Sequence, residues 1–195
     1  MTWIRDVDLA RMDASLFLDA TTLPTTLVNV DDANIAGTSL TSDTASFIAV
    51  DVQPGYIVCT SVMVLEVVEV LSDTELRVSR LRCEDLADLR PAPPQTMGKA
   101  RIATFERTIT DVEYALFERL GVDATTTNRP ESLRRLLTLE ALARMFEAEG
   151  ANRWSAESLT TRGRYYRTLA TEAAALIQED EPVRNRPGVS QLRRR

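Results

Sequence analysis

One stretch, residues 130–150, constrains the fold of this chain more than any other. Its sequence is PESLRRLLTLEALARMFEAEG, and at ~100° per residue its apolar side chains do not gather on one side of a helix. Leu133, Leu136 and Leu137 point one way, whereas Leu139, Leu142, Met145 and Phe146 cover much of the opposite half. A helix that is apolar nearly all round is a buried helix. We therefore expect other helices to cover it on several sides, and expect neighbouring subunits to supply part of that cover.

The ends of this helix are also marked in the sequence. Asn128 is a candidate N-cap, and Glu131 three residues later completes a capping box. Pro130 falls in the first turn, where its missing N–H costs nothing, and Gly150 is a natural end. The helix is therefore expected to be a discrete element with a loop on each side.

The rest of the chain divides into segments by the period of its apolar residues. Apolar residues close to alternation and rich in β-branched side chains follow residue 25, and helical periodicity returns near residue 101. The predicted fold class is α+β: a C-terminal antiparallel bundle of three main helices, a small antiparallel β domain near the N-terminus and an extended C-terminal tail. The predicted segments are an arm with a short helix (1–24), the β domain (25–82), a proline-rich linker (83–98), the helical bundle (99–181) and the basic tail (182–195).

The β domain is predicted to hold three to five short strands in a small sheet or barrel. Its strand candidates are LVNV, SFIAVDV, YIVCTSVMVLEVVEV and ELRVSRLR, with turns at Pro54-Gly55 and Ser72-Asp73. The aspartates between the strands lack the spacing of a calcium loop and are interpreted as turn residues. The RPAPP sequence that follows favours a semi-rigid, extended spacer, and an SH3-type ligand is the alternative.

Two amphipathic helices are predicted beside the central one. The first contains Ile102, Phe105, Ile109, Val112, Leu116 and Leu120 on one face, and its start is ambiguous because Thr110 and Glu113 also resemble a capping box. The second covers about residues 156–178 and contains Gly163. Because glycine costs roughly 1 kcal/mol against alanine inside a helix, Gly163 is expected to permit close helix packing.

Composition excludes several classes of function. The chain has no histidine, which removes Ser-His-Asp and Cys-His catalysis and almost every zinc site. The net charge is −6, which argues against tight nucleic-acid binding by the body of the protein. Cys59 and Cys83 are expected to be free thiols. We expect no catalytic residue, no metal, no cofactor and no membrane segment.

Two patterns of residues nevertheless have a chemical interpretation. Carboxylate pairs such as Glu66/Glu69 or Glu147/Glu149 would suit a histidine-free hydrolase. Tyr165 and Tyr166 among Arg162, Arg164 and Arg167 resemble a stacking platform for nucleic acid. Chance pairing and a solvated or subunit-facing helix edge are the simpler explanations of the two patterns.

The helical half resembles the head–tail connector proteins of tailed bacteriophages, also called adaptor or head-completion proteins. The resemblance lies in TFERTITDVEYALFERLGVDA, RPESLRRLLTLEALARMFEAEGA and RGRYYRTLATEAAALIQ, and it covers roughly residues 99–181. It implies a structural virion protein that forms a homo-oligomeric ring, typically of twelve copies, beneath the portal. Such a ring extends the DNA channel without specific DNA binding and joins the head to the tail or to a second neck protein.

This resemblance sets the expected sites. The C-terminal tail is expected to dock on the portal through Val183, Arg184, Arg186, Val189, Leu192, Arg193, Arg194 and Arg195. Subunit contacts are expected from Leu139, Leu142, Met145, Phe146, Tyr165 and Tyr166. The protein is expected in the neck of the virion, assembled in the host cytoplasm, where it would serve genome ejection. The alternative is a DNA-associated regulator that uses the arginines of the third helix and the tail.

Overall fold

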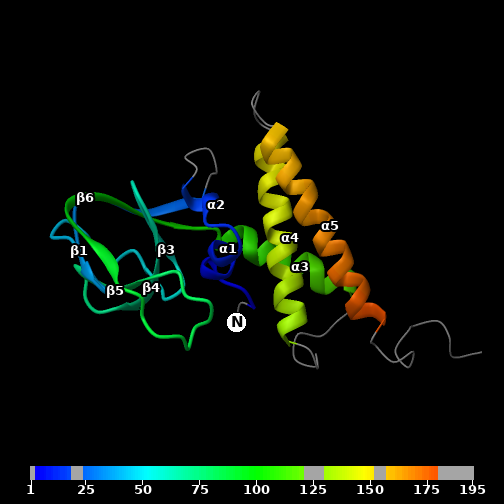
Figure 1. Cartoon of the computed structure of the whole chain (residues 1–195), viewed down its shortest axis with the longest axis horizontal. Coiled ribbons are helices and arrows are strands. Elements are labelled where there is room, and N and C mark those ends of the chain that lie inside the picture. The colour runs from blue at the N-terminus through cyan, green and yellow to red at the C-terminus, as the bar shows by residue number, and fades with distance from the viewer. Residues whose placement is uncertain (1–2, 19–23, 121–129, 152–156, 180–195) are drawn as a thin grey trace, which may run out of the picture.

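The computed structural model describes residues 3–18, 24–120, 130–151 and 157–179. Figure 1 shows a barrel at one side, helices at the other, and the N-terminal arm between them. The arm contains α1 (Asp6–Met12) and α2 (Ser15–Leu18). The strands are β1 (Thr25–Gly37), β2 (Ser39–Thr41), β3 (Ile57–Thr60), β4 (Val64–Val70), β5 (Glu75–Arg80) and β6 (Ala92–Thr104). The long helices are α3 (Glu106–Leu120), α4 (Pro130–Ala151) and α5 (Glu157–Glu179).

The six strands close into an antiparallel barrel in the order β1-β2-β5-β4-β3-β6. The long strands β1 and β6 pair from Thr25↔Thr104 to Gly37↔Ala92, with several register shifts along the way. Strand β6 also pairs with β3, but only from Ala100 to Ala103. The barrel therefore extends to residue 104, and its last strand leads directly into α3.

Burial on both faces of the barrel wall explains the nearly unbroken apolar sequence of β3 and β4. Val58 and Leu65 point into the barrel core. Their neighbours Ile57, Cys59 and Val64 point outward and join the core formed by the arm and the helices. Because successive side chains of a strand alternate between faces, a wall covered on both sides contains no regular polar positions.

Helix α4 is the centre of the helical half, as its apolar circumference predicted. It packs against α5, α3 and α1 of the same chain. The side chains of Leu139, Leu142, Met145 and Phe146 are all buried within this single chain. The expectation that neighbouring subunits are needed to cover α4 is therefore wrong, because the arm and the other two helices already cover it.

The predicted fold class, a helical bundle with a small β domain attached, is wrong. The β part is a closed barrel of six strands, and it shares a core with the arm and the helices. Residues 92–98 of the predicted linker form the first half of β6, paired with β1. Ile102 belongs to β6 and lies in the barrel core, so the first long helix begins at Glu106.

The predicted strand SFIAVDV is also wrong, because residues 46–52 form a loop of turns. Three other helix predictions are confirmed. The arm helix covers Asp6–Met12, the central helix begins at Pro130, and the last helix covers Glu157–Glu179. The chain's tail, residues 180–195, lies outside the described residues.

Candidate functional site

The arm is fixed between the barrel and the helices by buried ion pairs. Glu66 of β4 is almost fully buried and accepts from Arg11 of α1 at 3.0 Å and from Arg82. Asp8 of α1 pairs with Arg134 of α4 at 2.7 Å. Asp85, on the loop between β5 and β6, completes the network by pairing with Arg11 at 2.9 Å. These contacts join three parts of the chain that are distant in sequence.

The network surrounds a cavity of about 380 Å³ between α1, α4 and the loop of residues 83–86. Two carboxylates of its lining, Asp8 and Asp85, both pair with arginines of the same lining. The arginines beside Asp85 hold the pKa of that carboxyl below its usual range, against the opposing effect of burial. The arrangement is that of a structural junction, because Asp8, Arg11, Asp85 and Arg134 bind one another across it.

A second polar junction ties the turn between α1 and α2 to α5. The Tyr166 hydroxyl donates to Asp13 at 2.9 Å, and Arg162 pairs with the same carboxylate. The Arg162 guanidinium also lies 4.5 Å from the centre of the Phe146 ring, on which Tyr166 stacks at 5.7 Å. Burial, followed by the bond to Asp13, raises the pKa of Tyr166 to about 12.

The predicted interface residues are therefore placed very differently from one another. Among the six, Tyr165 alone is largely exposed, at 59%, and Tyr166 is half-buried. The other four belong to the core of α4. The predicted portal-docking residues Val183, Arg184, Arg186, Val189, Leu192, Arg193, Arg194 and Arg195 lie outside the described residues.

The arginine platform and the carboxylate pairs are largely engaged inside the chain. Arg162 is held by Asp13, and Arg167 binds Glu147 and Glu140, each at 2.6 Å. Glu66 binds Arg11 of the arm, whereas Glu69 pairs with Arg77 at the surface. The side chain of Glu149 lies outside the described residues. Within the described ranges, no group of three or more Cys, Asp or Glu side chains is arranged to hold a metal ion.

The two cysteines are free thiols in different surroundings. Cys59 is buried against the arm, and burial raises the pKa of its thiol. Cys83 is exposed and unpaired with another cysteine. At Cys59 the effect of burial outweighs that of the neighbouring Arg101, and a buried thiol of this kind is not an activated nucleophile.

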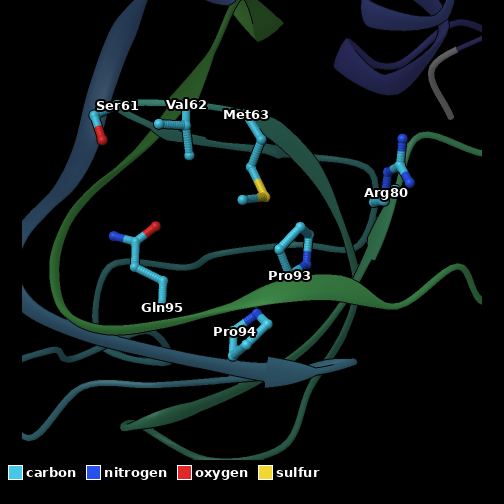
Figure 2. A pocket seen from close by; sticks show the side chains of 7 residues that line it. All are labelled: Ser61, Val62, Met63, Arg80, Pro93, Pro94 and Gln95. Carbon is cyan, nitrogen blue, oxygen red and sulfur yellow. The ribbon is translucent and has the colours of Figure 1, made fainter.

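A cavity in the barrel wall could not be predicted from the sequence. It measures about 580 Å³ and is lined by Ser61, Val62, Met63, Arg80, Pro93, Pro94 and Gln95. We call it the barrel window. It forms because the first half of β6 pairs with β1, whereas β3 joins β6 only from Ala100 onward. Figure 2 shows Met63 and the two prolines around the same space, with Arg80 at one side.

The window combines an apolar lining with a few polar groups, as ligand and peptide pockets commonly do. The Gln95 side-chain oxygen is buried and has no hydrogen-bond partner among the described atoms. The side chain of Gln95 folds over Gly98, where even a β-carbon would collide with it. Arg80 is exposed, and no acidic residue lines the window. An apolar group accompanied by a negative charge would suit this lining best.

None of the described helices is long and apolar enough to cross a membrane. Comparison with known proteins gives no assignment: no family model, no curated protein and no solved structure matches this chain.

Proposed function

We propose that this chain is a structural protein of a phage virion, an adaptor that forms a ring beneath the portal and joins the head to the tail. The observation that carries the proposal is the rigid connection between the barrel and the helices. Arm residues such as Ile4 and Leu16 share one core with β3, α3 and α4. Glu66 and Asp8 add buried ion pairs on both sides of the same arm. A protein that transmits force between two large assemblies needs such stiffness.

Charge and chemistry support the same proposal. The body is acidic, with a net charge of −6 for the whole chain, and an acidic surface lets DNA slide through a channel without adhering. The charged clusters described above are engaged in ion pairs within the chain, which fits a role in assembly better than a role in catalysis. The connector-like order of the three helical segments gives the proposal its specific form.

The proposal is tested by the oligomeric state of the full chain, alone and mixed with the portal protein of the same phage. Native mass spectrometry should find a ring or a stoichiometric complex with the portal. Deletion of residues 182–195 should abolish the portal complex and leave the circular dichroism spectrum unchanged. A protein that stays monomeric at every concentration and ignores the portal would contradict the proposal. Tight binding to duplex DNA with a steep salt dependence would favour the regulator instead.

A further inference from the structure

Ile48, Ala49 and Val50 form an exposed apolar turn at one end of the barrel, which we call the apolar knob. Ile48 is 59% exposed, and its two neighbours in the loop are also exposed. The loop is anchored on either side by Phe47 and Val52, whose side chains are buried in the barrel core. The knob therefore presents apolar surface to solvent from a fixed base.

Hydrogen bonds hold the knob in one conformation. Every backbone N–H from Phe47 to Val52 donates a hydrogen bond. Asp73 of the neighbouring turn takes part in three of them: its backbone oxygen accepts from Phe47, and its carboxylate accepts from Ile48 at 3.0 Å and Ala49 at 3.3 Å. Asp51 sustains a left-handed φ of 56°, which costs energy for a residue other than glycine. A preorganised apolar loop loses little entropy when it docks.

The knob and the barrel window lie at opposite ends of the β4–β5 hairpin. The window contains Met63, just before β4, and Arg80, the last residue of β5. The knob is bonded to the turn that joins the other ends of these strands, through Asp73. The six residues of β5 separate the two sites by roughly 17 Å, at ~3.3 Å per residue.

The two surfaces are complementary in polarity and charge. The knob is apolar and is accompanied by exposed carboxylates of Asp43, Asp51 and Asp73. The window is apolar where Val62, Met63 and the two prolines line it, and Arg80 supplies the opposite charge. Addition of a β-strand to the free edge of β6 is disfavoured, because Pro93 and Pro94 have no N–H to donate. A compact side-chain knob suits this window better than an extended strand.

We propose that the apolar knob of one copy of this chain inserts into the barrel window of the next copy. This inference rests on the proposed function and deepens it, because it places the contact between subunits of the ring on the barrel. Two different surfaces at opposite ends of one barrel make a head-to-tail contact, which generates a closed ring when the rotation between subunits closes. Ile48 fills the space beside Met63 and Pro93, and the acidic residues around the knob face Arg80.

The test uses two variants of the full chain that block one surface each. Ile48→Asp disables the knob, and Val62→Asp, at a position that is 73% exposed, disables the window. Sedimentation velocity and mass photometry should show that each variant alone loses assembly, with apparent affinity at least tenfold weaker than that of the unaltered chain. An equimolar mixture should form a heterodimer and nothing larger, because one intact knob and one intact window remain. Arg80→Glu should also weaken assembly.

Leu176→Asp is the matched control, since Leu176 is an exposed apolar residue on α5, outside both surfaces; circular dichroism melting verifies the fold of each variant. The inference is overturned if Ile48→Asp and Val62→Asp assemble as the unaltered chain does, if their mixture fails to pair, or if Leu176→Asp alone prevents assembly. In these cases the unaltered chain still forms its ring, and the adaptor proposal survives. An unaltered chain that is monomeric with and without the portal overturns both proposals.

Discussion

The carboxylate of Asp6 accepts a hydrogen bond from the backbone N–H of Phe105 at 2.7 Å. Phe105 stands between the end of β6 at Thr104 and the start of α3 at Glu106. The first helix of the arm therefore holds the point at which the barrel becomes the helical layer. Asp6 is almost fully buried there, so its ionisation is coupled to the integrity of the junction.

Asp6 should make the stability of the protein fall as pH rises. Burial is the main cause that raises its pKa from 3.8 to about 7, with smaller contributions from Glu106 and Asp8. Between these two values the folded state binds more protons than the unfolded state, so the free energy of unfolding decreases with rising pH. The contribution of Asp6 to the free energy of unfolding is fully present below about pH 4 and is lost as the pH rises through about 7.

The variant Asp6→Asn isolates this effect, because the amide oxygen still accepts from Phe105 and carries no charge. Urea unfolding between pH 4 and pH 8 should show a flatter profile for the variant, which becomes the more stable protein above pH 7. Glu113, whose pKa burial also raises, is present in both proteins and cancels in the comparison. Parallel profiles for the two proteins would contradict the assignment.

The sequence predicts the elements that are marked by local patterns. It does not predict those elements that depend on pairing between strands distant in the sequence. Pro130 and the apolar circumference of α4 marked that helix, and Gly163 marked a close helix contact. The proline-rich segment favoured an extended spacer, and that backbone is indeed extended, but pairing with β1 makes it a strand. Ile102 and Phe105 lie three residues apart and imitate a helical face, although Ile102 belongs to the barrel.

The two candidate surfaces, the apolar knob and the barrel window, also depend on contacts between segments that are distant in the sequence. The apolar pattern of SFIAVDV is that of a strand, but hydrogen bonds within the segment and to Asp73, more than twenty residues away, hold it as an exposed loop. The barrel window arises from the short pairing of β3 with β6, which no local pattern reveals. Burial of α4 was predictable from its composition, whereas the identity of the elements that cover it was not.

Glu140→Gln should destabilise the protein far more than Glu69→Gln, although each glutamate lies 2.6 Å from an arginine nitrogen. The Glu140 side chain is 3% exposed and faces Arg167, Arg119 and Arg144, whereas the Glu69 side chain is 51% exposed. Loss of charge at the buried site should cost about 2 kcal/mol, and loss of the surface pair about 0–1 kcal/mol. Chemical denaturation measures both, and equal costs would show that burial does not govern this pair.

Gly163→Ala should destabilise the protein despite the better helix propensity of alanine. A β-carbon at Gly163 would lie 2.9 Å from the Glu147 Cγ and 3.0 Å from the Glu147 backbone nitrogen. Because the backbone of α4 cannot shift cheaply, the overpacking should cost about 1–3 kcal/mol and exceed the ~1 kcal/mol gained in propensity. Thr168→Ala, at an exposed position of α5, is the control and should leave the melting temperature nearly unchanged or raise it. A stabilised Gly163→Ala variant would mean that α4 and α5 pack less closely than described.

Asp73→Ala should loosen the apolar knob, whereas Asp73→Asn should preserve it. The Asp73 carboxylate oxygen accepts from the N–H groups of Ile48 and Ala49, and asparagine retains an oxygen at that position whereas alanine does not. Native-state hydrogen exchange should therefore be faster at both amides in Asp73→Ala and close to that of the unaltered chain in Asp73→Asn. The cost in global stability should stay near 1 kcal/mol, because these exposed amides find water when the acceptor is lost. If the knob contacts the next subunit, Asp73→Ala should also weaken assembly, because the loop must then be ordered when it docks. Unchanged exchange at Ile48 and Ala49 in the alanine variant would show that the remaining loop hydrogen bonds hold the knob without Asp73.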